Sequence, residues 1–201
     1  MMLVLDDAQG TPEAIAQRIG ATAARYTASS PHGFIRYLQV FGEADIPALR
    51  DSNPADVPDG SRPSHYSDAV INDWYGRFQS ALGAIRAVNT DSKTVISISY
   101  LHYGFLTALK NKGLQWDIIG LDWYADMGAF SRVLTPVKAN FTQDILITET
   151  NIRPSGNNTY APISTWNWLT DGMAAVYAEP RVKGLIFYEL MDEPAISDPV
   201  E

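Results

Sequence analysis

Two glutamates each stand where an apolar, strand-like run of residues ends. Residues 35–41 form one such run, which is followed by Glu43, and residues 144–148 form another, which is followed by Glu149. Side chains at strand ends are held rigidly enough to face each other across a site. In glycoside hydrolysis one carboxyl group protonates the leaving oxygen while a second attacks the anomeric carbon. The two glutamates therefore point to the hydrolysis of a glycosidic bond.

The elements that must position these glutamates alternate between strands and helices. Apolar runs predict strands over residues 2–6, 35–41, 94–100, 116–124, 144–149 and 182–188. Helical spacing of apolar residues predicts helices over residues 11–26, 65–88, 105–112, 130–140 and 164–178. Strands that are apolar nearly throughout and separated by helices imply a parallel sheet covered on both faces. The irregular stretches 51–63 and 153–162 are expected to border the site and to set its specificity.

Either an open doubly wound sheet or a (β/α) barrel satisfies this alternation. The candidate site residues follow the ends of successive strands, and a barrel brings those ends into one ring. In an open sheet ligand contacts gather near one switch point, and no glycine-rich phosphate fingerprint follows the first strand. The sequence therefore favours an α/β fold of the TIM-barrel type, as one domain over residues 1–201.

Composition excludes several classes of protein. The 201 residues are 46% hydrophobic, which suits one core of ordinary size. The net charge of −8 and the lack of a basic cluster argue against a nucleic-acid partner and favour a neutral ligand. Without cysteine there is no disulfide, thiolate zinc site or cysteine nucleophile. No apolar run reaches the about 18 residues of a membrane span. The start lacks the features of a secretory signal, so a cytoplasmic location is expected, with secretion of a longer parent protein left open.

The chain resembles, over most of its length, the retaining β-glycosidases with (β/α)8 barrels known as clan A, which include cellulase-like and xylosidase-like enzymes. Residues 39–45 are similar to the end of the clan's fourth strand, which implies that Glu43 is the acid/base. Residues 146–151 are similar to the end of its seventh strand, which implies that Glu149 is the nucleophile. A retaining mechanism would place the two carboxyl groups roughly 5 to 5.5 Å apart.

Further residues are expected to bind substrate. The resemblance implies that Tyr124 orients the nucleophile, and that Tyr188, in a stretch similar to the eighth strand, stacks on a sugar ring. His102 is a candidate for a contact with the sugar or with the acid/base, although a lone histidine also serves as a structural donor. The remaining candidates for hydroxyl contacts are Asp122, Asp126, Asn151 and Asp192.

Two departures from the clan affect the expected activity and assembly. Gly42 replaces the asparagine that precedes the acid/base in the clan and contacts the sugar 2-hydroxyl, which implies weakened activity. The first two βα units have no counterpart, whereas a complete barrel needs about 250 residues. The exposed edge of an interrupted barrel must be covered, so a homodimer or higher homo-oligomer is expected. The alternative is that the chain is a fragment of a longer gene product.

No cofactor or metal is predicted. Glycoside hydrolysis by two carboxyl groups requires no cofactor, and the three histidines show no spacing of metal ligands. The leading hypothesis is a retaining hydrolase acting on a β-linked oligo- or polysaccharide. The alternative is a non-catalytic or weakly active carbohydrate-binding or assembly protein on the same scaffold. An isomerase or aldolase would need a lysine or a phosphate site at a strand end, and the sequence provides neither.

Overall fold

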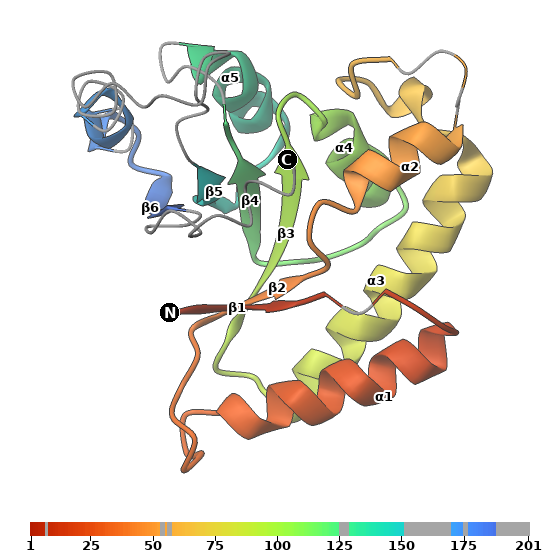
Figure 1. Ribbon diagram of the computed structural model, residues 1–201, viewed down its shortest axis with the longest axis vertical. Helices are drawn as coiled ribbons and strands as arrows, with labels where there is room; N and C mark the ends of the chain where they lie inside the picture. Colours follow the sequence, from red (N-terminus) through yellow and green to blue (C-terminus); the bar gives the residue numbers. More distant parts are fainter. Residues whose placement is uncertain are drawn as a thin grey trace, which may run out of the picture.

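The predicted alternation of strands and helices is present. The computed structural model describes residues 1–6, 8–52, 55, 58–124, 129–150, 170–174 and 177–187. Six parallel strands alternate with helices and form a curled half-barrel (Figure 1). This arrangement confirms the predicted fold class, an incomplete (β/α) barrel of the TIM type.

The strands follow one another in the sheet in the order in which they occur in the chain. They are β1 (Met2–Leu5), β2 (Tyr37–Val40), β3 (Lys93–Ser99), β4 (Ile118–Asp122), β5 (Asp144–Thr150) and β6 (Val182–Phe187). Every pair of neighbours is parallel, so all carboxyl ends lie along one rim. A doubly wound sheet would reverse its strand order at a switch point, and this sheet does not.

Five helices have both ends within the described residues, and two of them begin at a hydroxyl cap. The five are α1 (Pro12–Ala23), α2 (Asp45–Ser52), α3 (Asp68–Val88), α4 (Tyr103–Asn111) and α5 (Ser131–Asn140), with short 3-10 turns η1 (Ala24–Tyr26) and η2 (Pro63–His65). The Thr11 hydroxyl accepts the Ala14 N–H at 3.3 Å, which caps α1 as its sequence indicates. None of the helices among the described residues is long and apolar enough to cross a membrane.

Some boundaries differ from those predicted. Helix α3 begins at Asp68 rather than at His65, because the Ser67 hydroxyl caps the helix at Val70 N–H. Helix α2 was not predicted, and its last two residues, Asp51 and Ser52, fall within the stretch expected to be irregular. Most of the helix predicted over 164–178 lies outside the described residues.

The two faces of the sheet differ in polarity. The face toward the helices is apolar, and α1 and α3 pack against each other beside it (Figure 1). Phe78 and Phe105 form part of an aromatic cluster there, and Trp123 is buried against Phe130.

The opposite face becomes more polar toward the rim. Its lowest layer is a small apolar cluster that includes Val95 and Ile118. Above it, the Gln39 amide donates to the Ser97 hydroxyl at 2.9 Å. A methyl group on Gly120 would lie 2.8 Å from both the Ser97 Cβ and the Thr148 hydroxyl, so only glycine fits at this point of the layer. The carboxyl groups of the rim stand on this layer.

Candidate active site

Three carboxyl groups meet at the rim of the sheet. Glu43 follows β2, Asp122 ends β4 and Glu149 lies near the end of β5. One oxygen from each group lies within 4.8 Å of one oxygen from each of the others. Glu43 and Glu149 are the pair expected to react, and Asp122 was expected to contact substrate. The curvature of the half-barrel brings these three predicted residues together.

The segment that carries Glu43 has an unusual backbone. Phe41 and Glu43 have φ angles of 56° and 46°, in the left-handed region that residues with a side chain seldom adopt. Such conformations persist only where surrounding contacts hold them. The Phe41 N–H donates to Leu5 O at 3.2 Å, and the Gly42 N–H donates to Asp6 Oδ1 at 3.1 Å. Strand β1 and the residue after it therefore anchor the segment.

Ser99, the last residue of β3, connects Glu43 to a second acidic group. Its hydroxyl donates to Glu43 Oε1 at 2.6 Å, and its backbone N–H donates to Asp45 Oδ2 at 3.1 Å. Asp45 is fully buried at the start of α2, and burial raises the pKa of its carboxyl group against the opposing effects of His102 and the Ser99 N–H. The Glu43 side chain is thus fixed by a residue that is itself held in place.

His102 pairs with Asp45 through Nδ1. A methyl group on Gly60 would lie 2.7 Å from His102 Cγ, so the stretch after α2 packs closely on the ring. His102 was expected to contact the sugar or the acid/base. In the structure the ring pairs with Asp45, and the backbone N–H of His102 donates to Ser99 O at 3.1 Å. The predicted contact with a sugar stays a prediction.

Glu149 is held by a tyrosine. The Tyr124 hydroxyl donates to Glu149 Oε2 at 2.8 Å, the contact expected from the sequence. Partial burial raises the pKa of Glu149, the Tyr124 hydrogen bond lowers it, and the charges of Glu43 and Asp6 raise it again. Burial and the same hydrogen bond raise the pKa of Tyr124 above its usual range, so the hydroxyl keeps its proton and remains a donor.

Asp122 is the most deeply buried of the three groups, with 1% of its surface exposed. The Thr148 hydroxyl donates to its Oδ1 at 2.6 Å, and its Oδ2 has no partner within the described part of the chain. Burial raises the pKa of Asp122 well above its usual range, and the charges of Glu149, Glu43 and Asp45 add to this. A proton on Asp122 relieves the repulsion between three carboxyl groups at this spacing.

Carboxylate oxygens are ligands that hard divalent cations prefer. Glu43, Asp122 and Glu149 are accordingly the described residues that could hold such a cation. A cation at this position would occupy the oxygens that acid/base and nucleophilic chemistry require.

Several residues that hold the site were not among the sequence candidates. Ser99, Thr148 and Asp45 supply its hydrogen bonds, and Asp6 contacts the backbone before Glu43. The signal for Ser99 was the polar alternation at residues 95–99, and the signal for Asp6 was its place directly after an apolar run. Four predicted residues lie outside the described residues, namely Tyr188, Asn151, Asp126 and Asp192.

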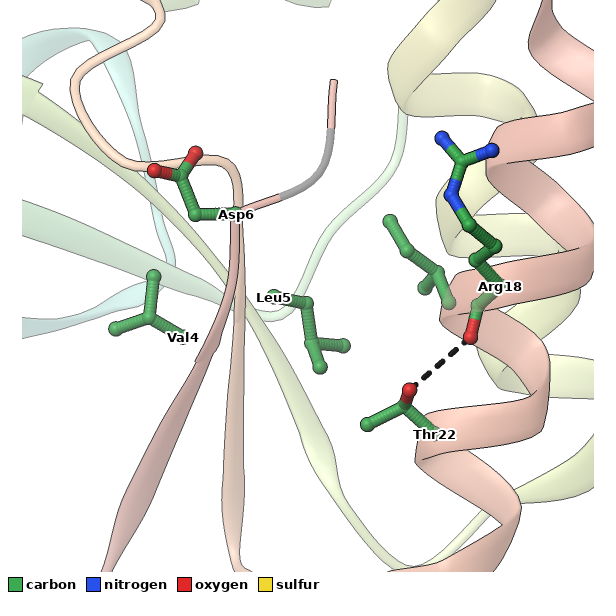
Figure 2. A pocket seen from close by; sticks show the side chains of 6 residues that line it. Val4, Leu5, Asp6, Arg18 and Thr22 are labelled. Carbon is green, nitrogen blue, oxygen red and sulfur yellow. Dashed lines mark hydrogen bonds between the residues drawn. The ribbon is translucent and has the colours of Figure 1, made fainter. Parts of the chain in front are cut away.

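A cavity of about 220 Å³ lies between β1 and α1, next to Asp6 (Figure 2). Leu5 points toward Arg18 and Thr22 on α1, whereas Val4 and Asp6 project from the other side of the strand (Figure 2). Asp6 therefore faces away from the helices, toward the side of the sheet that carries the polar layer.

Comparisons with known proteins identify the fold. No family model matches the chain, and no curated protein matches its sequence. Among solved structures, the GH53 catalytic domain of Ignisphaera aggregans is 17% identical, with a TM-score of 0.57 over 88% of this chain and 54% of that one. A glucosidase from Croceicoccus marinus is 14% identical, with a TM-score of 0.65 over 94% of this chain and 41% of the other.

A third similar structure, a calcium-binding mutant of β-glucuronidase 2 from Bacteroides uniformis, is 10% identical, with a TM-score of 0.69 over 95% of this chain and 23% of that protein. At these identities the likeness concerns the fold alone. The chain spans about half the length of the GH53 domain, and less of the other two proteins. Its half-barrel is therefore a fold shared with solved glycoside hydrolases.

Proposed function

We propose that the chain carries the active site of a retaining β-glycoside hydrolase, with Glu149 as nucleophile and Glu43 as acid/base. The observation that carries this proposal is the meeting of two glutamates from different strand ends, each fixed by a hydroxyl donor, with oxygens within 4.8 Å. Retaining enzymes hold their carboxyl groups roughly 5 to 5.5 Å apart, whereas inverting enzymes leave roughly 6.5 to 9.5 Å for a water molecule. The spacing supports double displacement.

In the first step Glu149 attacks the anomeric carbon while Glu43 gives its proton to the leaving oxygen, so that the glycosidic bond breaks and a glycosyl ester forms on Glu149. In the second step Glu43 takes a proton from water, which attacks the anomeric carbon and releases the sugar with Glu149 free again. Tyr124 binds Oε2 of Glu149, so Oε1 is the oxygen available for attack. A protonated Glu43 also lacks the charge that opposes ionisation of Glu149.

The proposed substrate is a neutral β-linked oligo- or polysaccharide. The net charge of −8 and the gathering of carboxyl groups at the rim would repel an acidic sugar. Uronic acid polymers are therefore expected to be poor substrates.

The test is hydrolysis of a panel of aryl β-glycosides and β-glucans by the wild type and Glu149→Gln. Glu149→Gln should lose turnover and still bind oligosaccharide. The matched control is Glu13→Gln, the same substitution on the exposed first turn of α1, which should keep full activity. NMR of the first-formed product should show the β-anomer; an α-anomer would contradict the retaining mechanism.

A second candidate is a carbohydrate-binding protein without turnover, which is favoured by one observation. Gly42 offers no side chain next to Glu43, where an amide would otherwise reach the sugar. Under this reading neither the wild type nor Glu149→Gln hydrolyses any glycoside, and both bind oligosaccharide with similar affinity.

A second copy of the chain is the proposed partner of the β1 edge. In the described sheet β1 pairs only with β2, and the Val4 side chain is 41% exposed. An unpaired edge with apolar side chains is a template for pairing with another strand. Light scattering should give at least twice the 22.2 kDa of one chain, and Val4→Lys should shift the mass toward the monomer. A monomeric wild type would contradict this assembly.

A further inference from the structure

Asp6 follows β1 at the same rim as the three carboxyl groups. Its side chain lies on the face of the strand that points away from α1 (Figure 2). Its carboxyl group accepts the N–H of Gly42, the residue directly before Glu43, and its charge raises the pKa of Glu149. Asp6 is therefore a fourth acidic group at the border of the site, contributed by the outermost strand of the described sheet.

The Asp6 carboxyl group fills the space in front of Gly42. A methyl group on Gly42 would meet only atoms of Asp6 within 4 Å, with Cγ and Oδ2 both 3.8 Å away. A side chain at residue 42 would project from the backbone directly before Glu43. The carboxyl group of Asp6 thus lies at van der Waals distance from the point where such a side chain would begin.

Within the described part of the chain, one oxygen of Asp6 has a hydrogen-bond partner and the other has none. Oδ1 accepts the Gly42 N–H at 3.1 Å, and the described residues provide no donor for Oδ2. The Asp6 side chain is exposed, so Oδ2 is open to a ligand. A carboxylate oxygen accepts hydrogen bonds, and the hydroxyl groups of a sugar donate them.

We infer that Asp6 is a substrate-binding residue whose free carboxylate oxygen accepts a hydrogen bond from a hydroxyl of the sugar ring that lies between Glu43 and Glu149. This inference rests on the proposed function and deepens it, because it assigns sugar recognition to a residue from another strand that stands in front of Gly42. The Gly42 N–H fixes the orientation of the carboxyl group, so the second oxygen is presented in one direction.

The test is a double-mutant cycle in which one change removes the Asp6 carboxyl group and the other removes a hydroxyl group of the sugar. Wild type, Asp6→Ala and Asp6→Asn are assayed on a parent aryl β-glycoside and on its 2-deoxy and other monodeoxy forms. A deoxy substrate that lacks the bound hydroxyl loses a hydrogen bond to a charged group. The wild type should therefore show a kcat/KM about 10- to 100-fold lower on that substrate than on the parent. In Asp6→Ala the same deoxy substrate should be cleaved about as well as the parent.

Asp6→Asn is the matched control, because its amide oxygen can still accept the Gly42 N–H while the charge is lost. It should keep the fold and retain part of the hydroxyl preference. If Asp6→Ala instead lowers activity on all substrates by one factor and leaves every deoxy penalty unchanged, Asp6 only anchors Gly42 and the inference is overturned.

The same cycle is run on binding, so that its result is separate from that of the proposed function. The dissociation constants of the parent and deoxy glycosides are measured for Glu149→Gln with and without Asp6→Ala. A hydroxyl preference that depends on Asp6 supports the inference even if the wild type shows no turnover. Equal preferences in both variants, or no binding of any glycoside, overturn it.

Discussion

Tyr124→Phe tests whether the tyrosine stabilises the reactive anion at Glu149. The substitution removes one hydroxyl, which donates to Glu149 Oε2 at 2.8 Å, and leaves the ring in place. This hydrogen bond lowers the pKa of Glu149, so its loss should raise that pKa. A hydrogen bond to a charged group is worth about 1.5 to 3 kcal/mol, and the partial exposure of Glu149 reduces this to about 1 kcal/mol.

That free energy corresponds to a shift of about 0.7 pH units, since one unit of pKa equals about 1.36 kcal/mol. Glu149, as the proposed nucleophile, must be ionised to react, and its anion is lost as the pH falls. The acid limb of the kcat/KM profile should therefore move to higher pH by about this amount in Tyr124→Phe. At neutral pH the loss of orientation should lower kcat/KM about 10-fold, which is about 1.4 kcal/mol.

The assay is the pH dependence of kcat/KM on an aryl β-glycoside. Tyr75→Phe is the matched control, because it removes a hydroxyl that accepts the Gln79 amide at 3.1 Å on α3, a helix that carries none of the site residues. Its profile should coincide with that of the wild type. An unchanged acid limb in Tyr124→Phe would refute the reasoning, and so would an acid limb moved to lower pH.

Three further predictions concern the groups around the site. Ser99→Ala removes the hydroxyl that donates to Glu43 but keeps the N–H that binds Asp45. Its kcat/KM should therefore fall about 10-fold, while its thermal midpoint should change little. A kcat/KM equal to that of the wild type would contradict the positioning role of Ser99. Asp122→Asn removes a buried acid whose pKa is raised in the folded state, so the wild type loses stability as the pH rises through that pKa and the variant does not. Urea unfolding should find the variant more stable at neutral pH and no different in acid. The opposite order at neutral pH would be evidence against a raised pKa of Asp122 in the folded state. Gly60→Ala should destabilise the fold by roughly 1 to 3 kcal/mol, because its φ angle is +72° and the added methyl group would meet the His102 ring. The control Gly76→Ala, where the methyl group meets open space on α3, should stabilise the fold by roughly 0.5 to 1 kcal/mol. Urea midpoints that rank the two variants the other way would contradict this.

The strands and most helices could be predicted because their signals are local. Apolar runs mark the strands, and caps such as Thr11 mark the helix starts. Helix α2 could not be predicted in this way, because it is short, contains Pro47 and follows the strained segment that ends at Glu43. Its first residue, Asp45, is held by Ser99 and His102, which are distant in sequence.

The two glutamates proposed to react were candidates because each follows an apolar run, but the contacts around them depend on the register between strands. Asp122 lies opposite Glu149 only because the pairing of β4 and β5 shifts after Leu121. The role of His102 depends on Asp45, a partner 57 residues away. Nothing in the sequence around Asp6 indicates that its carboxyl group accepts the N–H of Gly42. Tertiary contacts of this kind are not visible in a single sequence.

Because the strands follow one another in chain order, genetic recombination can separate the two halves of the site cleanly. Each glutamate lies in the same stretch of chain as the groups that hold it, and these stretches do not overlap. The first stretch holds Glu43, Asp45, Ser99 and His102, and the second holds Asp122, Tyr124, Thr148 and Glu149. A genetic exchange within α4 would pass between them and transfer each set complete. Related half-barrels could therefore exchange the half that carries Glu43 and the half that carries Glu149 as heritable blocks, so that new pairings arise with both hydrogen-bonded sets intact.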